Sequence, residues 1–302
     1  MRTVLAGDLG GTKCRFALVA EDGTVVAAER VATSRDRAQF LAALEQGIER
    51  VLARRPDGLA PPDAIGMGTA GVIEPDGRAI ARAPNLPLDG FALAGHLEQR
   101  FGLRATLLND GRASAWGEYR TGAARGADPL LCLFFGTGIG IGLMVGGAPY
   151  AGADNAAGEI GHTLHVPGGE PCPCGGRGHY EAYCGGRPIG ERGLRELGPP
   201  PDGHHAWHLG NLAGRTDAAA RRIFDEAVTA AGALTANAIT LFNPRAVVIG
   251  GGVVDGWPPL RERVEAFVRR ECAAMVTDKL RFHPSLGGSD AILVGAAAAA
   301  GR

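Results

Sequence analysis

The chain has 302 residues, of which 45% are hydrophobic and 21% are charged, and its formal net charge is −1. This composition is typical of a soluble globular protein, and the length is sufficient for two compact lobes with separate cores. A near-neutral charge without a basic run disfavours nucleic acid as a partner. No apolar segment is long enough to cross a bilayer and no signal-peptide pattern opens the chain, so we expect a cytoplasmic protein without a membrane partner.

The first predicted elements flank a glycine-rich stretch, Gly7–Lys13. Residues 3–6 predict a buried strand, and the alternation over residues 14–19 predicts a second one. Between them, the glycines leave backbone N–H groups open to a phosphate, and Asp8 offers a carboxylate suited to hydrated Mg²⁺. The same stretch is also typical of a plain tight hairpin, so it does not establish a phosphate site by itself.

The elements that follow are those of an α/β lobe. Two prolines predict that Ala83–Pro87 is extended. Asn109 and Asp110 open a predicted helix from about residue 111 to 119, where an Asp commonly serves only as a cap. We place the boundary of the first lobe just before them. The other expected elements of this lobe are strands 24–31, 64–69 and 105–108 and helices 36–54 and 92–101.

A second glycine loop, Gly136–Gly142, follows an apolar strand at 131–135, and a third, Gly250–Gly252, follows a strand at 246–249. None of the three loops has the spacing of a dinucleotide-binding motif or of a P-loop. Two strand–glycine–strand hairpins predict a duplicated domain that holds a phosphate chain from both sides. The remaining expectations are a long glycine-rich segment at 147–190, helices 215–242 and 259–275, a strand at 280–282 and a final helix.

Four side chains in the glycine-rich segment have a spacing that suits tetrahedral metal coordination. Zinc would order a loop that contains few apolar residues. Two buried thiols and two surface histidines are an equally good interpretation of the spacing alone. The four residues are His162, Cys172, Cys174 and His179.

Motifs along nearly the whole chain resemble those of the ROK family of repressors and sugar kinases, within the actin–hexokinase–Hsp70 superfamily. They are GDLGGTK, GTAG, APNLP, LLND, FFGTGIGIG, GEIGH, CPCGGRGHYEAY, ITLFNP, VVIGGGVV and GSDAILVGAA. The resemblance implies an α/β, two-lobed actin-like ATPase fold, a duplicated ribonuclease-H-like topology with an interlobe cleft. The first lobe would comprise residues 1–108, completed by a C-terminal helix at 290–302. The second, residues 109–289, would hold the zinc loop and the adenosine-binding motif.

The resemblance also implies a reaction, the phosphorylation of a hexose at its 6-hydroxyl by ATP·Mg²⁺, with glucose favoured and glycolysis as the setting. Asp110 would be the general base and would also bind the sugar. The other implied sugar contacts are Gly71, Asn85, Asn109, Glu159, His162 and Glu181. The implied contacts to ATP and Mg²⁺ are Asp8, Gly10, Gly11, Thr12, Lys13, Thr137, Gly138, Gly251 and Gly252.

One position departs from the family pattern, which has a cysteine where His179 stands. Histidine is a good zinc ligand, so we expect a structural Cys₂His₂ site, with Cys184 as the second choice for the fourth ligand. The resemblance implies that His162 places one ring nitrogen on zinc and turns the other toward the sugar. A bond at one nitrogen fixes the tautomer and the orientation of the ring.

Several alternatives stay open at this point. N-acetylglucosamine, N-acetylmannosamine, fructose, mannose and allose are other possible sugars, and polyphosphate is another possible donor. A sugar-sensing repressor would carry a helix-turn-helix domain, which we do not expect because the sequence opens at the first strand. A catalytically inactive scaffold is disfavoured by the presence of Asp8, Lys13 and Asp110 together. Relatives of this family are often dimers, so we expect a homodimer.

Overall fold

The computed structural model describes residues 2–201, 203–286 and 288–301. The chain divides into two compact units. The first unit consists of Met1–Gly126, Gly142–Ala157 and Leu286–Arg302, and the second consists of Ala127–Ile141 and Gly158–Ser285. No helix in the described part of the chain has the length and apolar character that a membrane span requires.

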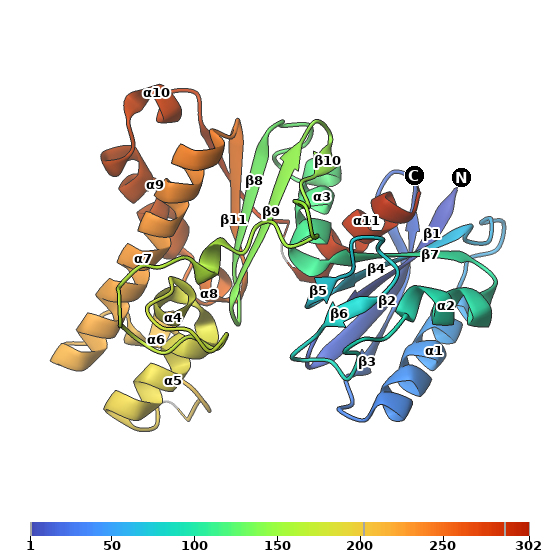
Figure 1. The fold of residues 1–302 in the computed structure, drawn as a ribbon, viewed down its shortest axis with the longest axis horizontal. Coiled ribbons are helices and arrows are strands. Elements are labelled where there is room, and N and C mark those ends of the chain that lie inside the picture. The colour runs from blue at the N-terminus through green and yellow to red at the C-terminus, as the bar shows by residue number, and fades with distance from the viewer. Residues whose placement is uncertain (1, 202, 287, 302) are drawn as a thin grey trace. The chain divides into compact units, whose positions relative to one another are not determined.

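A five-stranded sheet with the order β3-β2-β1-β4-β7 forms the centre of the first unit (Figure 1). The first three strands pair antiparallel, whereas β1, β4 and β7 run parallel. All five predicted strands of this part of the chain are confirmed. The bounds are β1 Thr3–Leu9, β2 Lys13–Ala20, β3 Val25–Ala32, β4 Ala64–Thr69 and β7 Arg104–Asn109, with a small hairpin of β5 Val72–Ile73 and β6 Ile80–Arg82.

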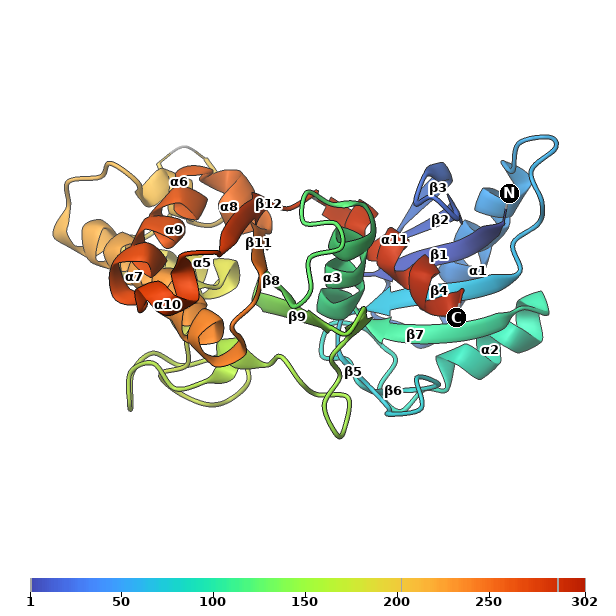
Figure 2. The same ribbon diagram turned by 90° about the horizontal axis from the view of Figure 1, so that it is seen from above.

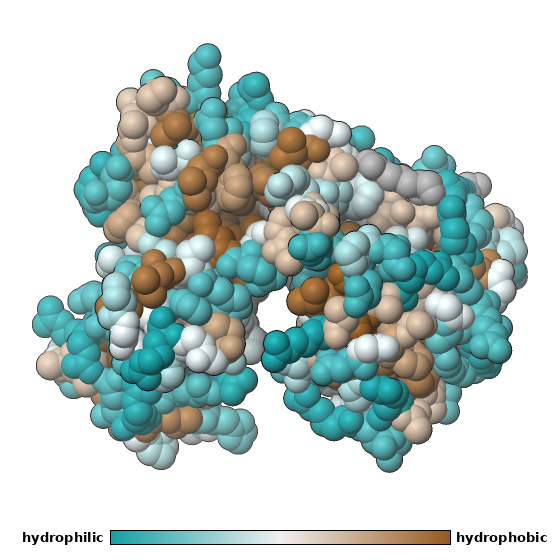
Figure 3. Space-filling view, in the orientation of Figure 1, coloured by the Kyte–Doolittle hydropathy of each residue, from teal (hydrophilic) through white to brown (hydrophobic). Residues whose placement is uncertain are grey.

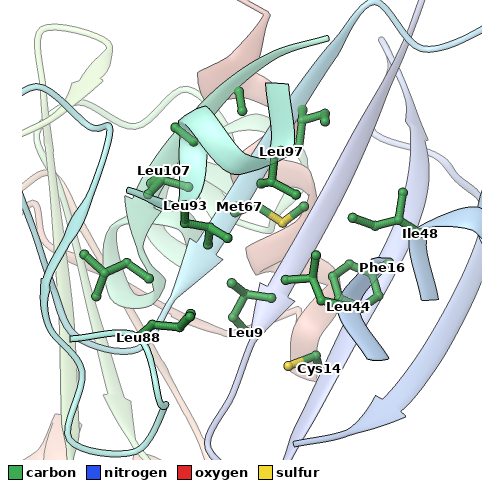
Figure 4. Close-up of a cluster of buried hydrophobic side chains, with 14 of the residues drawn as sticks. Leu9, Cys14, Phe16, Leu44, Ile48, Met67, Leu88, Leu93, Leu97 and Leu107 are labelled. Atoms are coloured by element: carbon green, nitrogen blue, oxygen red, sulfur yellow. The ribbon is translucent and has the colours of Figure 1, made fainter. Parts of the chain in front are cut away.

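Both faces of this sheet are buried. One face packs against α1 (Arg37–Ala53) and α2 (Leu93–Phe101), and the other packs against α11 (Gly288–Ala300). Alternate residues of one strand therefore enter different cores, which explains the continuous apolar runs in the sequence. Figure 4 shows the first core, where side chains from strands and helices meet, among them Leu9, Phe16, Leu44, Ile48, Met67, Leu93, Leu97 and Leu107.

The second sheet has the order β10-β9-β8-β11-β12, with β11 parallel to both β8 and β12. Each sheet therefore starts from a hairpin around a glycine loop and continues with two further parallel strands on the other side. This repeated order confirms the predicted duplication. The bounds are β8 Leu130–Phe135, β9 Ile139–Val145, β10 Ala148–Pro149, β11 Ala246–Gly250 and β12 Arg281–Pro284.

The helices of the second unit begin within the long glycine-rich segment, and the longer ones follow it (Figure 2). The longest, α7, ends at Asn243, which adopts a left-handed conformation with φ 42°, as the Asn-Pro stop signal predicted. The helices are η1 Ile160–His162, α4 Glu181–Cys184, α5 Gly186–Leu197, α6 Leu209–Leu212, α7 Ala218–Phe242, α8 Gly252–Gly256, α9 Pro259–Glu271 and α10 Ala274–Thr277.

Two local predictions were wrong. The helix expected at 259–275 breaks at Cys272, whose φ of −86° and ψ of 149° are those of an extended residue. The segment Ala83–Pro87 is not extended, because the Leu86 N–H donates to the Ala83 carbonyl at 3.0 Å and closes a turn. Proline is favoured at the second position of such turns, and Pro84 occupies it. Helices α5 and α8 were not expected from the sequence.

Helix α3, Asp110–Thr121, belongs to the first compact unit, although the predicted second lobe begins at residue 109. It packs against α11 at very close range. A Cβ atom on Gly117 would lie 2.0 Å from the Ala291 carbonyl oxygen, and one on Gly295 would lie 1.8 Å from that of Ala113. The predicted lobe limits, including the assignment of residues 290–302 to the first lobe, stay a prediction. Arg302 lies outside the described residues.

The surface is mostly hydrophilic on the face drawn in Figure 3, with apolar residues concentrated over the region that Figure 1 labels α9, β11 and β8. Several large apolar side chains of the described residues are also exposed. Among those of the second unit are Leu241 at 72% exposure and Met275 at 88%. Isolated apolar side chains are normal on protein surfaces, but larger groups of them commonly mark a contact with another protein.

Replacing Gly117 by alanine should destabilise the protein, because the new methyl group would overlap the backbone of α11. Overpacking of this kind costs about 1–3 kcal/mol. Gly95→Ala is the matched control, since Gly95 is exposed on α2 and a methyl group there would meet no other part of the chain within 4 Å. It should raise the free energy of unfolding by up to about 1 kcal/mol through helix propensity. Denaturant unfolding measures both, and equal stability of the two variants would contradict the packing argument.

Candidate functional site

Three parallel strands of the first sheet end side by side. Leu9 of β1 pairs with Thr69 of β4, and Thr69 pairs with Asn109 of β7. The carboxyl ends of these strands therefore share one edge, the usual position of ligand sites in open α/β sheets. The predicted site residues of the first unit all follow or lie near these ends: Asp8, Gly10, Gly11, Thr12, Lys13, Gly71, Asn85, Asn109 and Asp110.

The first glycine loop is a tight turn between β1 and β2. The Gly10 N–H donates to the Lys13 carbonyl at 3.2 Å, and the side chains of Thr12 and Lys13 are exposed. A Cβ atom on Gly11 would lie 2.8 Å from that of Asn85, so a larger residue would force the two segments apart. The loop thus lies against Asn85 at Gly11 and exposes a hydroxyl and an ammonium group at the next two residues.

Asp8 and Asp110 form the acidic part of this edge. Burial raises the pKa of Asp8 to about 7, and the charge of Asp110 contributes to this rise, whereas Arg15 and Lys13 act in the opposite direction. Burial and a neighbouring carboxylate both disfavour the ionised form of a carboxyl group. A cation bound beside the two carboxylates favours the ionised form of both. The pair therefore fits a divalent ion such as Mg²⁺, which prefers one or two carboxylates together with phosphate oxygens.

Asn109 connects α3 to the loop after β4. Its Oδ1 accepts from the N–H groups of Gly111 at 3.0 Å and Arg112 at 3.3 Å, which makes it the N-cap of α3, and its Nδ2 donates to the Gly71 carbonyl at 3.1 Å. Gly71 has φ 133°, which favours glycine. Asp110 Oδ1 accepts from the Gly111 N–H at 2.8 Å. The start of α3 is therefore held against the segment at Gly71.

The second glycine loop is supported by Glu181. The Ile139 N–H donates to Glu181 Oε2 at 2.8 Å, and a Cβ atom on Gly138 would lie 2.4 Å from the same oxygen. The Arg187 N–H donates to the Thr137 carbonyl at 2.9 Å. Glu181 is only 9% exposed. Through the hydrogen bond to Ile139, one of its oxygens fixes the loop that carries Thr137 and Gly138. Sequence reasoning assigned Glu181 to the sugar and missed this supporting contact.

The third glycine loop lies against the end of β8. Gly251 has φ 98°, and a Cβ atom there would lie 2.5 Å from the Phe135 carbonyl oxygen. Gly252 begins α8 directly afterwards. The second and third glycine loops are therefore adjacent within the second unit, because Phe135 is the last residue before the second loop.

The metal-ligand candidates converge. The ligand atoms of His162, Cys172, Cys174 and His179 all lie within 4.8 Å of one another. Cys172 Sγ is 3.6 Å from His162 Nδ1, and Cys174 Sγ is 3.2 Å from His179 Nδ1. Zn–N bonds of about 2.0 Å and Zn–S bonds of about 2.3 Å in a tetrahedron separate the ligand atoms by about 3.3–3.8 Å. The two Sγ–Nδ1 separations lie in or just below this range and none of the others exceeds 4.8 Å, so the donor set suits zinc, with the ligand atoms drawing closer on binding.

The Cys172 thiol of this cluster is buried. Burial raises the pKa of the Cys172 thiol to about 12, and the neighbouring Cys174 contributes to the increase. A metal ion would supply the charge that both thiolates need. His162 turns its other ring nitrogen, Nε2, toward Glu159 Oε2 at 3.8 Å. Cys184 is buried and donates to the Tyr180 carbonyl at 3.3 Å, and it is not part of the described cluster.

Comparison with known proteins identifies the family. The sequence model of the ROK family matches residues 4–302. The chain belongs to the ROK family. It is 32% identical over 269 residues to a glucokinase of Streptomyces coelicolor, covering 84% of this chain and 83% of the relative. It is also 32% identical over 304 residues to an N-acetylmannosamine kinase of Shigella flexneri, covering 98% and 97%.

A solved structure supports the same assignment. A ROK family glucokinase from Streptomyces griseus, crystallised with glucose and AMPPNP, superposes on this chain with a TM-score of 0.82 and 31% identity, covering 99% of both chains. This ROK protein therefore has the two-domain actin-like ATPase fold of the family, as its motifs predicted. It is an enzyme, a kinase. The individual roles of its site residues stay predictions.

Changing His179 to alanine should remove one of four ligands and leave most of the protein without zinc after desalting. Elemental analysis of the purified protein measures this loss. His205→Ala, at an exposed histidine outside the cluster, is the control and should retain zinc. Unchanged zinc in the His179 variant, together with its loss from a Cys184→Ala variant, would show that Cys184 is the fourth ligand.

Proposed function

We propose that this ROK kinase transfers the γ-phosphoryl group of ATP to the 6-hydroxyl of a hexose, with glucose as the favoured sugar. The observation that carries the proposal is the shared strand edge of the first unit, where the glycine turn, Asp8 and Asp110 come together. The names of the relatives support it, since the Streptomyces griseus structure is of a glucokinase with glucose and AMPPNP.

Asp110 acts as the general base in this proposal. It is the first residue of α3, and the Gly111 N–H bonded to Oδ1 holds the carboxylate in place. The carboxylate takes the proton of the sugar hydroxyl as the oxygen attacks the γ-phosphorus. Such proton transfer typically contributes about 10²–10⁴ to the rate.

The glycine loops provide alignment, which is most of what phosphoryl transfer requires of a protein. In the proposal Gly10, Gly11, Thr12 and Lys13 bind the β- and γ-phosphates, and Thr137 and Gly138 contribute a second set of contacts. Gly251 and Gly252 contact the adenosine. Asp8 would hold Mg²⁺, which would neutralise phosphate charge. The ammonium of Lys13 and the backbone N–H groups of the first loop add to this neutralisation.

The sugar would be bound by amide, carboxylate and imidazole groups, which match the many hydroxyls of a hexose. The first unit contributes Asn85, Asn109 and the backbone at Gly71. The second contributes Glu159, His162 and Glu181. Zinc at His162, Cys172, Cys174 and His179 would be structural, and it would fix the ring of His162 through Nδ1 so that Nε2 stays available for a hydroxyl.

An N-acetylhexosamine kinase is the second candidate, because the Shigella flexneri relative is an N-acetylmannosamine kinase of equal identity to this chain. Fructose, mannose and allose as acceptors and polyphosphate as donor are weaker alternatives, and the sugar-sensing repressor is not retained because the chain is a kinase. We also propose a cytoplasmic homodimer acting in carbohydrate metabolism. The exposed apolar side chains of Leu241, Phe242 and Met275 support a contact between copies.

A panel of hexoses and N-acetylhexosamines, assayed with ATP·Mg²⁺ by coupled ADP release, should give the highest kcat/KM with glucose. Polyphosphate tested in place of ATP should be a poorer donor. A higher kcat/KM with N-acetylmannosamine than with glucose would support the second candidate. Absence of turnover across the panel with zinc-loaded, folded protein would contradict the kinase proposal for hexoses as a class.

Replacing Asp110 by asparagine should lower kcat about 10²–10⁴-fold while leaving the KM for glucose within a few-fold of the wild-type value. Asparagine keeps the size and the Oδ1 acceptor for the Gly111 N–H but cannot take a proton. Asp225→Asn, at an exposed carboxylate on α7, is the control and should retain full activity. A kcat of the Asp110 variant close to that of wild type would remove Asp110 from the mechanism.

A further inference from the structure

The first turn of α3 carries a buried arginine that the mechanism above does not use. Arg112 is 3% exposed and lies two residues after Asp110. Its Nη2 donates to the Asn155 carbonyl at 2.8 Å and its Nη1 to the Ala151 carbonyl at 3.4 Å. One guanidinium therefore spans two carbonyls that lie four residues apart on the same loop.

This loop has few apolar anchors. Besides Arg112, it is held by the Ala157 N–H, which donates to the Ala151 carbonyl at 2.9 Å, and by the side chain of Asn155. Gly152, Ala153, Asp154 and Ala156 are exposed, and they offer small or polar side chains rather than apolar anchors. Segments with few buried apolar contacts open easily in native proteins. Burying a guanidinium costs free energy unless its N–H groups find acceptors. The two hydrogen bonds of Arg112 offset this cost, and they also fix the conformation of the loop.

Asn155 continues the chain of contacts. It has φ 56°, one of two non-glycine residues with a positive φ in the described structure. Its Nδ2 donates to the carbonyls of Ile73 at 3.0 Å and Glu74 at 3.3 Å. These two residues follow closely after Gly71 in sequence, and the Gly71 carbonyl accepts from Asn109. The segment from Gly71 to Glu74 is thus held from both ends.

Both sets of hydrogen bonds start from the first turn of α3. Asn109 caps α3, and Arg112 fixes the loop that carries Asn155, while Asp110 lies between them in sequence. We propose that Arg112 and Asn155 are positioning residues for the hexose, which set the Gly71–Glu74 segment at a defined place relative to Asp110. This inference rests on the proposed function, because it takes Gly71 and Asn109 as sugar contacts.

We expect substitutions of Arg112 and Asn155 to change the KM for the sugar more than the KM for ATP. Arg112→Lys keeps the charge, but a single ammonium cannot reach both carbonyls. Asn155→Gly keeps the positive φ without strain and removes the amide. Each variant should raise the KM for glucose about tenfold, leave the KM for ATP within about twofold and lower kcat less than about threefold. Both changes act through one loop, so the double variant should show less than the product of the two single effects.

Arg120→Lys is the matched control, since Arg120 lies on the last turn of α3 and is exposed. It should leave both KM values unchanged. Equal increases in the KM for ATP and for glucose in the Arg112 variant would indicate a general structural defect and overturn the inference. A glucose KM within about twofold of wild type in both single variants, with an active wild type, would overturn it as well.

Hydrogen–deuterium exchange separates this inference from the proposed function. Arg112→Lys should increase amide exchange in peptides that cover residues 146–157 and 71–82, and should leave α9 unchanged. Arg120→Lys should change neither peptide. If the wild type lacked kinase activity, the proposed function would fail, and the exchange result would still decide the network. Unchanged exchange in the Arg112 variant would overturn the network irrespective of activity.

Discussion

The close packing of α3 on α11 is the interaction on which the candidate site of the first unit depends. Gly117 and Gly295 let the two helices approach until a methyl group on either would overlap the facing backbone. The buried carboxylate of Glu118 on α3 also accepts from the N–H of Leu286, which precedes α11 in the chain, at 2.7 Å. Because α3 is fixed along its length, its first turn holds Asn109, Asp110 and Arg112 at a constant position beside the ends of the parallel strands.

The glycine loops also depend on close approach between segments of the chain. A side chain at Gly11 would collide with Asn85, one at Gly138 with Glu181, and one at Gly251 with the backbone of Phe135. In each case a residue expected to bind phosphate or adenosine lies against a polar side chain or a strand end. The glycines therefore do more than expose N–H groups, since the first two also bring predicted phosphate contacts next to predicted sugar contacts.

The cluster of candidate metal ligands shows how one substitution can leave four possible ligand atoms close together. His179 occupies a position where the family pattern has cysteine, yet its Nδ1 is 3.2 Å from Cys174 Sγ, slightly closer than two ligands of tetrahedral zinc. If the proposed zinc binds, its binding free energy would add to the stability of this loop. His162 connects that stability to the proposed sugar site through its second ring nitrogen, which faces Glu159.

The sequence alone determined the strands around the glycine loops, the cap at Asn109, the stop of α7 at Asn243 and the family, because these signals are local in the chain. Two predictions from local patterns were wrong. The helical pattern of 259–275 is interrupted at Cys272, and Pro84, expected in an extended segment, lies in a turn. Only the tertiary structure decided that α3 packs with the first unit, that Glu181 supports the second loop, and that Arg112 reaches Asn155. The last two contacts join residues 42 and 43 positions apart, and no periodicity or spacing encodes which distant backbone group a buried side chain will meet.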